Sequence, residues 1–280
     1  MTDVSPFSLA TSNDRTIQGF VHTASRSGPR PTVVICHGFK GFMEWGVFPF
    51  LADLLAKRGL TAVRFNFTGS GMKPGDDLVT DLDAFRTATF SKDHEEVVLV
   101  LEALGNRVAQ GLVDRARIGL FGHSRGGGSA ILAAADPRTQ QLVKSLVTWS
   151  AVSTFDRLPE AEKAVWRQEG IMTIANARTG QELPIGSVVL EDLETHSDRI
   201  DILAAASRIQ APWLIVHGGD DETVPIAEAH QLAEAASAPV ALEEIPEGLH
   251  TFGATHPFSG STPQLIQALN TTQAWFRKYL

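Results

Sequence analysis

The stretch Leu120–Gly128 reads "LFGHSRGGG" and places one serine, Ser124, among glycines directly after an apolar run. Residues 122–126 fit the pattern G-x-S-x-G. Between a strand and a helix, this pattern forms a sharp, strained turn that exposes the serine hydroxyl at the carboxyl end of a sheet. The same glycines could also form an ordinary strand–helix turn with no chemistry. The rest of the chain must therefore supply the partners that a serine nucleophile needs.

The residues around Ser124 fit that context, because "RIGLFGH" (117–123) predicts a strand and the Ala-rich segment 126–137 predicts a helix. Further strands are expected over 7–11, 16–24, 31–38, 60–67, the end of 141–152, 211–219 and 240–246, and helices over 45–59, 91–106, 226–237 and 262–280. Strands separated by helix-length segments predict an α/β fold with a mostly parallel central sheet flanked by helices. We expect the first two strands to be antiparallel.

One segment, 153–207, breaks this alternation and is richer in charge. The chain shows no internal repeat and no low-complexity linker. We therefore expect a single domain over 1–280, with 153–207 as a cap-like insertion within it.

Composition limits the possible partners. The net charge is −8 and no Lys/Arg cluster occurs, which argues against nucleic acid and anionic membrane as partners. The first ten residues show no signal-peptide pattern, and no apolar run reaches 18 residues, so we expect a soluble cytoplasmic protein. The one cysteine, Cys36, lies in the apolar run "TVVIC" and is expected to be a buried small hydrophobe.

A serine nucleophile needs a base, and the base needs an acid to orient it. "HGGDDETVP" (217–225) follows a predicted strand and carries two aspartates, and "EGLHTFG" (247–253) follows the next strand and offers His250. The order Ser, Asp, His suits a nucleophile elbow, and the carboxyl ends of parallel strands meet at one edge of the sheet. His256, beside Pro257, is the competing base.

The loop "CHGFKGF" (36–42) follows the strand over 31–36 and precedes the first long helix. This is where a nucleophile elbow takes its second oxyanion donor. We therefore expect the backbone N–H groups of Phe39 and Arg125 to form an oxyanion hole, and His37 to be a structural loop residue rather than the base.

Three separated signatures carry a family resemblance: "HGF" at 37–39, "GHSRGG" at 122–127, and "HGGDDETVP" together with "LHTF" near the C-terminus. With them, the chain resembles an α/β-hydrolase from about residue 16 to 280, and loosely resembles small cinnamoyl/feruloyl-type esterases and acylpeptidase relatives. The resemblance implies a Ser nucleophile, a His base, an orienting Asp and an acyl-enzyme intermediate formed without a cofactor. The related pattern H-G-x-x-D-x-x-V-P places the acid at Asp221, with Asp220 second and Asp156 third.

These observations predict a serine hydrolase, a carboxylesterase that cleaves a small ester or acyl substrate through Ser124, His250 and Asp221. An acylpeptidase-like peptidase and a catalytically silent binding protein are the alternatives, and a lyase or perhydrolase would keep the same residues. No HExxH and no spaced His/Cys pairs occur, so no metal site is expected. The sequence predicts no oligomeric state. Candidate substrate-binding residues are Trp149, Trp166, Met172 and Phe252, and we expect Trp166 and Met172 of the cap to form the roof of a pocket over Ser124.

Overall fold

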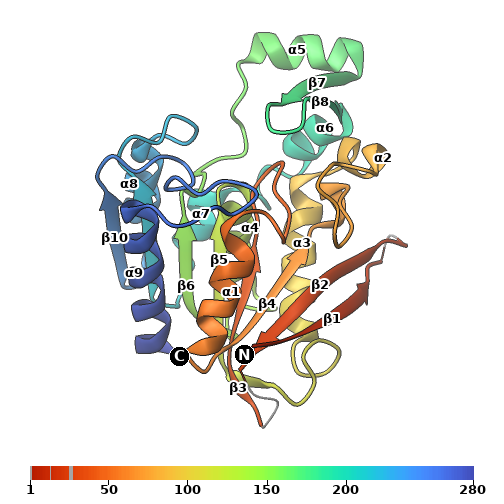
Figure 1. The fold of residues 1–280 in the computed structure, drawn as a ribbon. Helices are drawn as coiled ribbons and strands as arrows, with labels where there is room; N and C mark the ends of the chain where they lie inside the picture. Colours follow the sequence, from red (N-terminus) through yellow and green to blue (C-terminus); the bar gives the residue numbers. More distant parts are fainter. Residues whose placement is uncertain (1, 13, 25–27) are drawn as a thin grey trace.

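The computed structural model describes residues 2–12, 14–24 and 28–280, and at its centre lies an eight-stranded sheet (Figure 1). The spatial order is β1-β2-β4-β3-β5-β6-β9-β10. The pairs β1–β2 and β2–β4 are antiparallel, and every other neighbouring pair is parallel. The strands are β1 (Asp3–Ala10), β2 (Thr16–Thr23), β3 (Arg30–Cys36), β4 (Thr61–Asn66), β5 (Val113–His123), β6 (Val143–Trp149), β9 (Trp213–Gly218) and β10 (Val240–Ile245).

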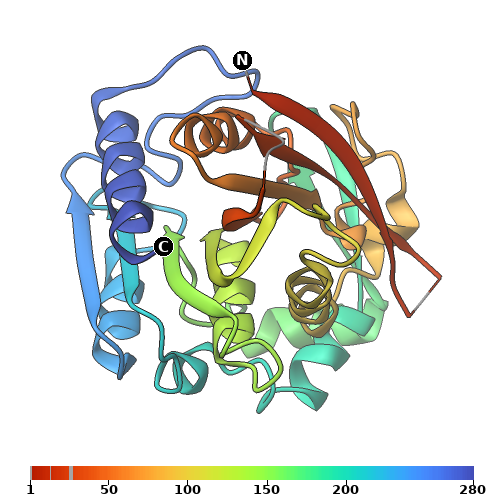
Figure 2. The ribbon, with the colours of Figure 1, turned by 90° about the horizontal axis from the view of Figure 1, so that it is seen from below.

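Helices cover both faces of this sheet, as the view along the strands shows (Figure 2). One face packs against α1 and α9, and the other against α3, α4, α7 and α8. The helices are α1 (Val47–Lys57), η1 (Thr68–Ser70), α2 (Leu82–Arg86), α3 (Phe90–Ala103), α4 (Arg125–Ala135), α5 (Glu160–Glu169), α6 (Val188–Thr195), α7 (Ile202–Ala206), α8 (Ile226–Ala235) and α9 (Pro263–Tyr279).

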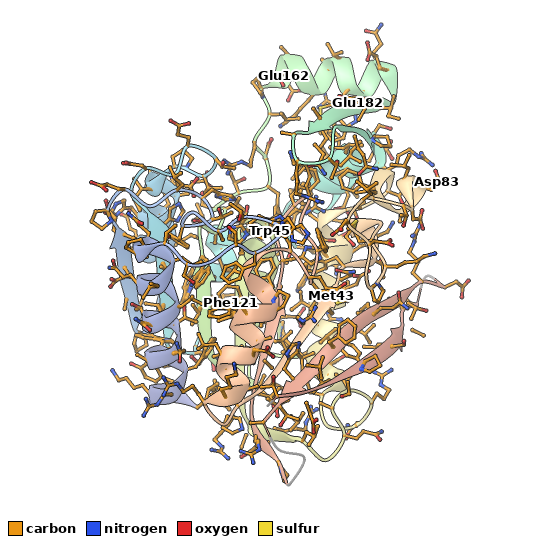
Figure 3. All side chains as sticks on the ribbon, viewed as in Figure 1. Met43, Trp45, Asp83, Phe121, Glu162 and Glu182 are labelled. Carbon is orange, nitrogen blue, oxygen red and sulfur yellow. The ribbon has the colours of Figure 1, made fainter. Side chains whose placement is uncertain are left out.

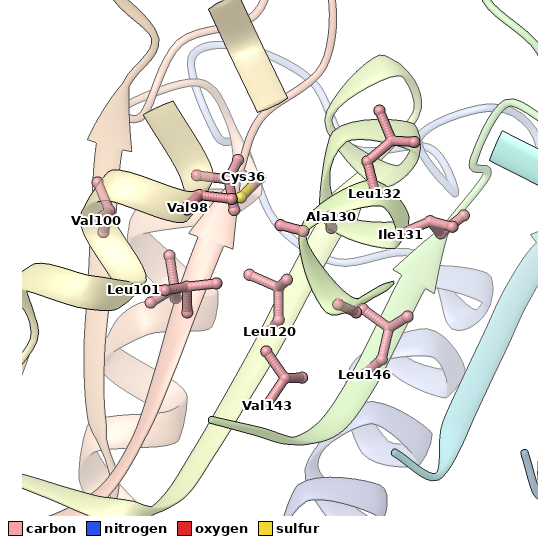
Figure 4. Packing of buried hydrophobic residues seen from close by; sticks show 14 of the residues in the cluster. Cys36, Val98, Val100, Leu101, Leu120, Ala130, Ile131, Leu132, Val143 and Leu146 are labelled. Carbon is pink, nitrogen blue, oxygen red and sulfur yellow. The ribbon is translucent and has the colours of Figure 1, made fainter. Parts of the chain in front are cut away.

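The two faces of β5 show why its sequence is continuously apolar. Leu120 packs with α3 and α4 on one face, and Phe121 packs with α1 and α9 on the other. Figure 4 shows Leu120 beside Val98 of α3 and Ala130 of α4. A parallel strand covered on both sides has no solvent face, so alternation of polar and apolar residues disappears. Cys36 at the end of β3 is fully buried in the same cluster, and burial raises the pKa of its thiol.

The α/β architecture and the mostly parallel sheet are confirmed, and the differences lie at element ends. β1 begins at Asp3 rather than near residue 7, and β5 begins at Val113 rather than 117. Helix α3 starts at Phe90, one residue before the predicted start at 91. Its N-cap is Thr89, whose hydroxyl accepts the Lys92 N–H. Helix α2 lies in a stretch for which the sequence predicts no element.

Between β6 and β9 the chain forms α5, the hairpin β7 (Ile171–Asn176) and β8 (Gln181–Gly186), and α6, which rise above the carboxyl ends of the strands (Figure 1). We call α5 to α6 the cap. The cap residues belong to a third apolar cluster, separate from the two that cover the sheet. Side chains of α2 and of the loops beneath the cap complete this cluster. Glu162 and Glu182 lie on its outer part, far from Phe121 in the sheet (Figure 3). Helix α7 packs with α4 in the main core, so the end of the 153–207 segment belongs to the sheet layer.

Candidate active site

Ser124 lies at the junction of β5 and α4 in a strained turn. Its backbone has φ 55° and ψ −124°, a region that a residue with a side chain rarely adopts. The Ser124 N–H donates to the Trp149 carbonyl (2.9 Å), which fixes the turn against the end of β6. A Cβ added to Gly126 would lie 2.2 Å from the His37 carbonyl oxygen, and one added to Gly122 would lie 2.4 Å from the Gly126 carbonyl oxygen. Only glycines allow this close approach, as the G-x-S-x-G pattern requires.

Asp221 and His250 are in direct contact on two neighbouring loops. His250 Nδ1 lies 2.8 Å from Asp221 Oδ2, and Asp221 Oδ1 accepts the N–H groups of Thr223 and Val224, each at 2.9 Å. The carboxylate is fully buried, whereas a fifth of the His250 side chain is exposed. Burial acts to raise the pKa of Asp221, but the hydrogen bonds and charge of His250, together with the two backbone N–H groups, hold it below its usual range. Asp221 is therefore ionised, and its Oδ2 faces His250 Nδ1 at 2.8 Å and, more distantly, His217 Nε2 at 3.5 Å, whose hydrogen bond is to the Val224 carbonyl (2.8 Å).

The neighbouring aspartate takes no part in this contact. Asp220 is exposed, and its backbone N–H donates to the Gly248 carbonyl (3.0 Å), so its peptide ties the acid loop to the loop that carries His250. Asp156 forms an ion pair with Lys163 of α5 (2.5 Å). Of the three aspartates that the sequence offers, Asp221 is the one placed beside His250.

Strand register brings these loops to one edge of the sheet. Cys36 is aligned with Gly122 across β3 and β5, and His123 with Trp149 across β5 and β6. Gly218 is aligned with Ile245 across β9 and β10. The segments that follow β3, β5, β9 and β10, which carry Phe39, Ser124, Asp221 and His250, therefore leave the sheet at the same end.

His123 links the base to the elbow. Its Nε2–H donates to the His250 carbonyl oxygen (3.0 Å), and the two imidazole rings lie 4.8 Å apart, centroid to centroid. Burial first, and then the proximity of His250, lower the pKa of His123 to about 3, so this ring is neutral at ordinary pH. The base is thus attached, through its own backbone, to the residue that precedes Ser124. The sequence does not predict this role for His123, because no local pattern connects residues 123 and 250.

The other histidines near the site have structural partners. His37 donates from Nδ1 to the Gly38 carbonyl (2.9 Å) and accepts the Phe67 N–H at Nε2 (3.2 Å), and burial lowers its pKa to about 4. The geometry agrees with the prediction that His37 is a loop residue. His256 accepts the Gly46 N–H at Nδ1 (2.9 Å) and contacts Asp77 at Nε2 (3.0 Å), so it supports the loop above α1 rather than Ser124.

The two predicted oxyanion donors are free to bind a ligand atom. Phe39 and Lys40 occupy the middle of a turn closed by the Gly41 N–H and the Gly38 carbonyl (3.1 Å), with Lys40 at φ 56°. Arg125 is the first residue of α4. Over residues 2–12, 14–24 and 28–280, neither the Phe39 N–H nor the Arg125 N–H has a hydrogen-bond acceptor. Backbone N–H groups without an acceptor beside a serine are what an oxyanion hole requires.

Three of the four predicted substrate-binding residues lie in packed clusters instead of a pocket. Trp149 packs against Phe121 and Phe252 in the α1/α9 layer, and its indole N–H donates to the Thr272 hydroxyl (2.9 Å). Trp149 and Phe252 are both 1% exposed. Trp166 is buried in the cap cluster and donates from its indole N–H to the Ile185 carbonyl (3.0 Å). The large apolar surfaces of these three side chains stabilise the core, where most such side chains are found.

Met172 is different, since it lies on β7 and packs only partly buried against the cap cluster. It is the one of the four whose side chain is neither fully enclosed nor hydrogen-bonded to the core. Among the side chains that the structure describes, no three His, Cys, Asp or Glu residues are placed to hold a metal ion. No helix within the described ranges is long and apolar enough to cross a membrane.

Comparison with known proteins identifies the fold and the family. Residues 45–280 match the prolyl oligopeptidase family. An uncharacterised 31.7 kDa protein from the traX–finO intergenic region of Escherichia coli is 25% identical over 284 residues, covering 89% of this chain and 91% of that protein.

Two solved structures superpose over nearly the whole chain. The complex of DcsB with a substrate analogue gives a TM-score of 0.76 at 16% identity, covering 99% of both chains. Est1E from Butyrivibrio proteoclasticus gives a TM-score of 0.71 at 17% identity, covering 98% of both, and Est1E is also known with ferulic acid bound. At such identities the likeness shows the fold, which is that of an α/β-hydrolase.

Proposed function

The chain belongs to the prolyl oligopeptidase family of serine hydrolases, and from that premise we propose that it cleaves carboxylic esters through Ser124, His250 and Asp221. The observation that carries the proposal is the 2.8 Å contact between His250 Nδ1 and the buried Asp221 carboxylate, on loops that leave the sheet beside the elbow. Asp221 fixes the tautomer in which Nδ1 carries the hydrogen. Nε2 is then left as an acceptor for the serine proton.

These placements support the following reaction. The Ser124 Oγ attacks the acyl carbon and passes its proton to His250 Nε2, while the carbonyl oxygen becomes an oxyanion that the Phe39 and Arg125 N–H groups stabilise. His250 then protonates the departing alkoxide, and the C–O bond to the alcohol breaks. Water attacks the acyl-enzyme with His250 again as base, and the carboxylic acid and free Ser124 are released. No cofactor enters either half of the reaction.

The second candidate function is peptide hydrolysis, which the family match favours. The same residues would protonate an amine instead of an alkoxide, and the poorer leaving group would place more of the barrier on the proton transfer from His250. The esterase domain of a Rhodothermus marinus protein, which superposes with a TM-score of 0.65 over 99% of both chains at 19% identity, supports the ester as substrate. Both reactions use the same nucleophile, so a substrate comparison separates them only after that nucleophile is established.

We further propose that the cap is an insertion in a single catalytic domain and sets the choice of substrate. It rises over the strand ends (Figure 1), and its hairpin reaches the loop of the proposed oxyanion hole, where Lys40 Nζ donates to the Ala175 carbonyl (3.3 Å). Loops at this edge of a sheet are where such folds vary their specificity.

A fluorophosphonate probe tests the nucleophile. We expect the folded protein to be labelled at Ser124, the variant Ser124→Ala to be unlabelled, and the control Ser197→Ala, which changes an exposed serine of the 153–207 segment, to label normally. Loss of Ser124 should lower kcat for a p-nitrophenyl ester by several orders of magnitude. An unlabelled wild type, or full esterase activity in Ser124→Ala, would refute the proposal. If an N-acyl aminoacyl anilide is hydrolysed faster than the matching ester, the protein is a peptidase and not an esterase.

A further inference from the structure

The side chain of Arg125 has a fixed position that the proposed triad does not explain. Its Nε and a terminal nitrogen both lie 2.8 Å from Asp93 Oδ2, and that terminal nitrogen also donates to the Ala88 carbonyl (2.9 Å). The side chains of Arg125 and Asp93 are only 13% and 8% exposed. Asp93 lies in the first turn of α3, 32 residues before Arg125. The guanidinium is thus immobilised below the elbow.

The same guanidinium contacts the other half of the proposed oxyanion hole. Its central carbon lies 5.4 Å from the centroid of the Phe39 ring and 4.3 Å from that of Phe90, and the Phe39 ring packs against Phe85 at 5.6 Å. Phe39, Phe85, Asp93 and Arg125 also line one small hollow beside the loop. A cation over an aromatic face is attracted by the ring. Phe39 is 39% exposed, and these contacts nevertheless give its ring a defined position.

We propose that Arg125, held by Asp93, is a positioning residue that aligns both oxyanion donors. Its own backbone N–H is one donor, and its side chain holds the ring of Phe39, whose backbone N–H is the other. The turn around Phe39 is closed by the bond from the Gly41 N–H to the Gly38 carbonyl and is tethered through Lys40 Nζ to the Ala175 carbonyl (3.3 Å), but neither bond holds the Phe39 ring. This inference rests on the proposed function and adds a residue to it.

Stability alone gives no reason for this ion pair. A positive side chain in the first turn of α4 opposes the helix dipole, and burying an ion pair commonly costs as much as it returns. Burial, with a smaller contribution from the charge of Asp192, raises the pKa of Asp93 above its ordinary value even with Arg125 beside it. A rigid planar cation that reaches Asp93 and two rings at once has, in contrast, a clear use in fixing the loop.

The test removes the pair without leaving a buried charge. In the double variant Arg125→Met/Asp93→Leu we expect native circular dichroism, a kcat lowered on the order of 10²-fold, as for loss of an oxyanion donor, and KM changed only slightly. The affinity for a trifluoromethyl ketone, which places an oxyanion in the hole, should fall by the same factor. The control Arg138→Met breaks the ion pairs of a partly exposed arginine with Glu95 and with the buried Asp136, and should keep kcat.

A second series keeps the idea testable if the double variant fails to fold. Phe39→Leu changes a partly exposed ring and should lower kcat by roughly tenfold or more, whereas Phe39→Tyr, which keeps the ring, should restore it. The effects of Phe39→Leu and Arg125→Lys, which keeps a positive charge beside Asp93 but loses the planar guanidinium, should be less than additive, because both act on one contact. Unchanged kcat in Phe39→Leu, or full additivity, would overturn the inference. Activity that survives Ser124→Ala would instead overturn the proposed function.

Discussion

Replacing Asp221 by asparagine separates the charge of this residue from its hydrogen bonds. The amide oxygen of the new side chain can still accept the Thr223 and Val224 N–H groups that Asp221 Oδ1 accepts at 2.9 Å, so we expect the loop to keep its conformation. The amide nitrogen would then face His250 Nδ1 in place of Oδ2, which lies at 2.8 Å. An N–H₂ group cannot accept from Nδ1–H, so the imidazole would move its hydrogen to Nε2 and could not take the proton of Ser124.

The size of the loss follows from the contact. Two opposite charges about 4 Å apart interact by about 4 kcal/mol at an effective dielectric constant near 20, which is the stabilisation that Asp221 gives to a protonated His250. That energy corresponds to on the order of 10³-fold in rate. The unfavourable tautomer adds to it, and a loss of about 10⁴-fold in kcat is known for this change in a serine–histidine–aspartate triad.

The assay is steady-state hydrolysis of a p-nitrophenyl ester, with circular dichroism to verify folding. The matched control is Asp220→Asn, which removes one negative charge from the adjacent, exposed position and leaves the 2.8 Å contact intact. We expect Asp221→Asn to lower kcat by about 10³- to 10⁴-fold and Asp220→Asn by less than about threefold. A folded Asp221→Asn variant that keeps a tenth of the wild-type kcat would refute the assignment, and the reverse ranking would move the acid to Asp220.

Two further predictions concern stability. His37 and His123 are buried and neutral, with pKa values lowered to about 4 and about 3, so the unfolded chain binds more protons below pH 6.5. The stability that the two neutral rings allow is fully present above pH ~6.5. As the pH is lowered to 5, each histidine should reduce the free energy of unfolding by about 2 kcal/mol. A urea midpoint that stays constant or rises as the pH is lowered from 7 to 5 would contradict this prediction. Trp166→Ala removes the indole from the cap cluster and its bond to the Ile185 carbonyl, so it should destabilise the cap by about 3–5 kcal/mol. Limited proteolysis should then cut within 160–195, and resistance there equal to that of the wild type would show that Trp166 does not support the cap.

The parts of the proposed site can be located in the sequence because each follows a recognisable strand. Ser124 follows the buried, apolar end of β5 and Asp221 follows the buried strand β9, whereas His250 follows β10, a mostly half-buried edge strand; the carboxyl ends of all three meet at one edge of the sheet. The choice of Asp221 over Asp220 depended on a spacing pattern. The structure supplies the physical reason, since successive residues point in different directions and only one of the two carboxylates can face His250.

The surroundings of the candidate substrate-binding aromatics, and of Arg125, are harder to predict from the sequence, for reasons that differ between residues. Trp149 lies two residues after Val147 on β6, and both point to the α1/α9 face, but the sequence does not say which face of a strand carries the site. Trp166 depends on a contact between α5 and the hairpin, and Arg125 on a contact with Asp93 in α3. Neither contact leaves a local periodicity, because each joins elements that meet only after the chain has folded.

The burial of Cys36 makes the protein well suited to distance measurements by thiol labelling. The chain contains this single cysteine, its side chain is completely enclosed, and its raised pKa keeps the sulfur in the unreactive thiol form. Maleimide dyes should therefore ignore the native protein and react only with cysteines introduced at exposed positions. Val165 on the cap and Leu249 beside the base are 53% and 55% exposed. A dye pair at these two positions would report, molecule by molecule, whether the cap keeps one distance from the catalytic edge or exchanges between several.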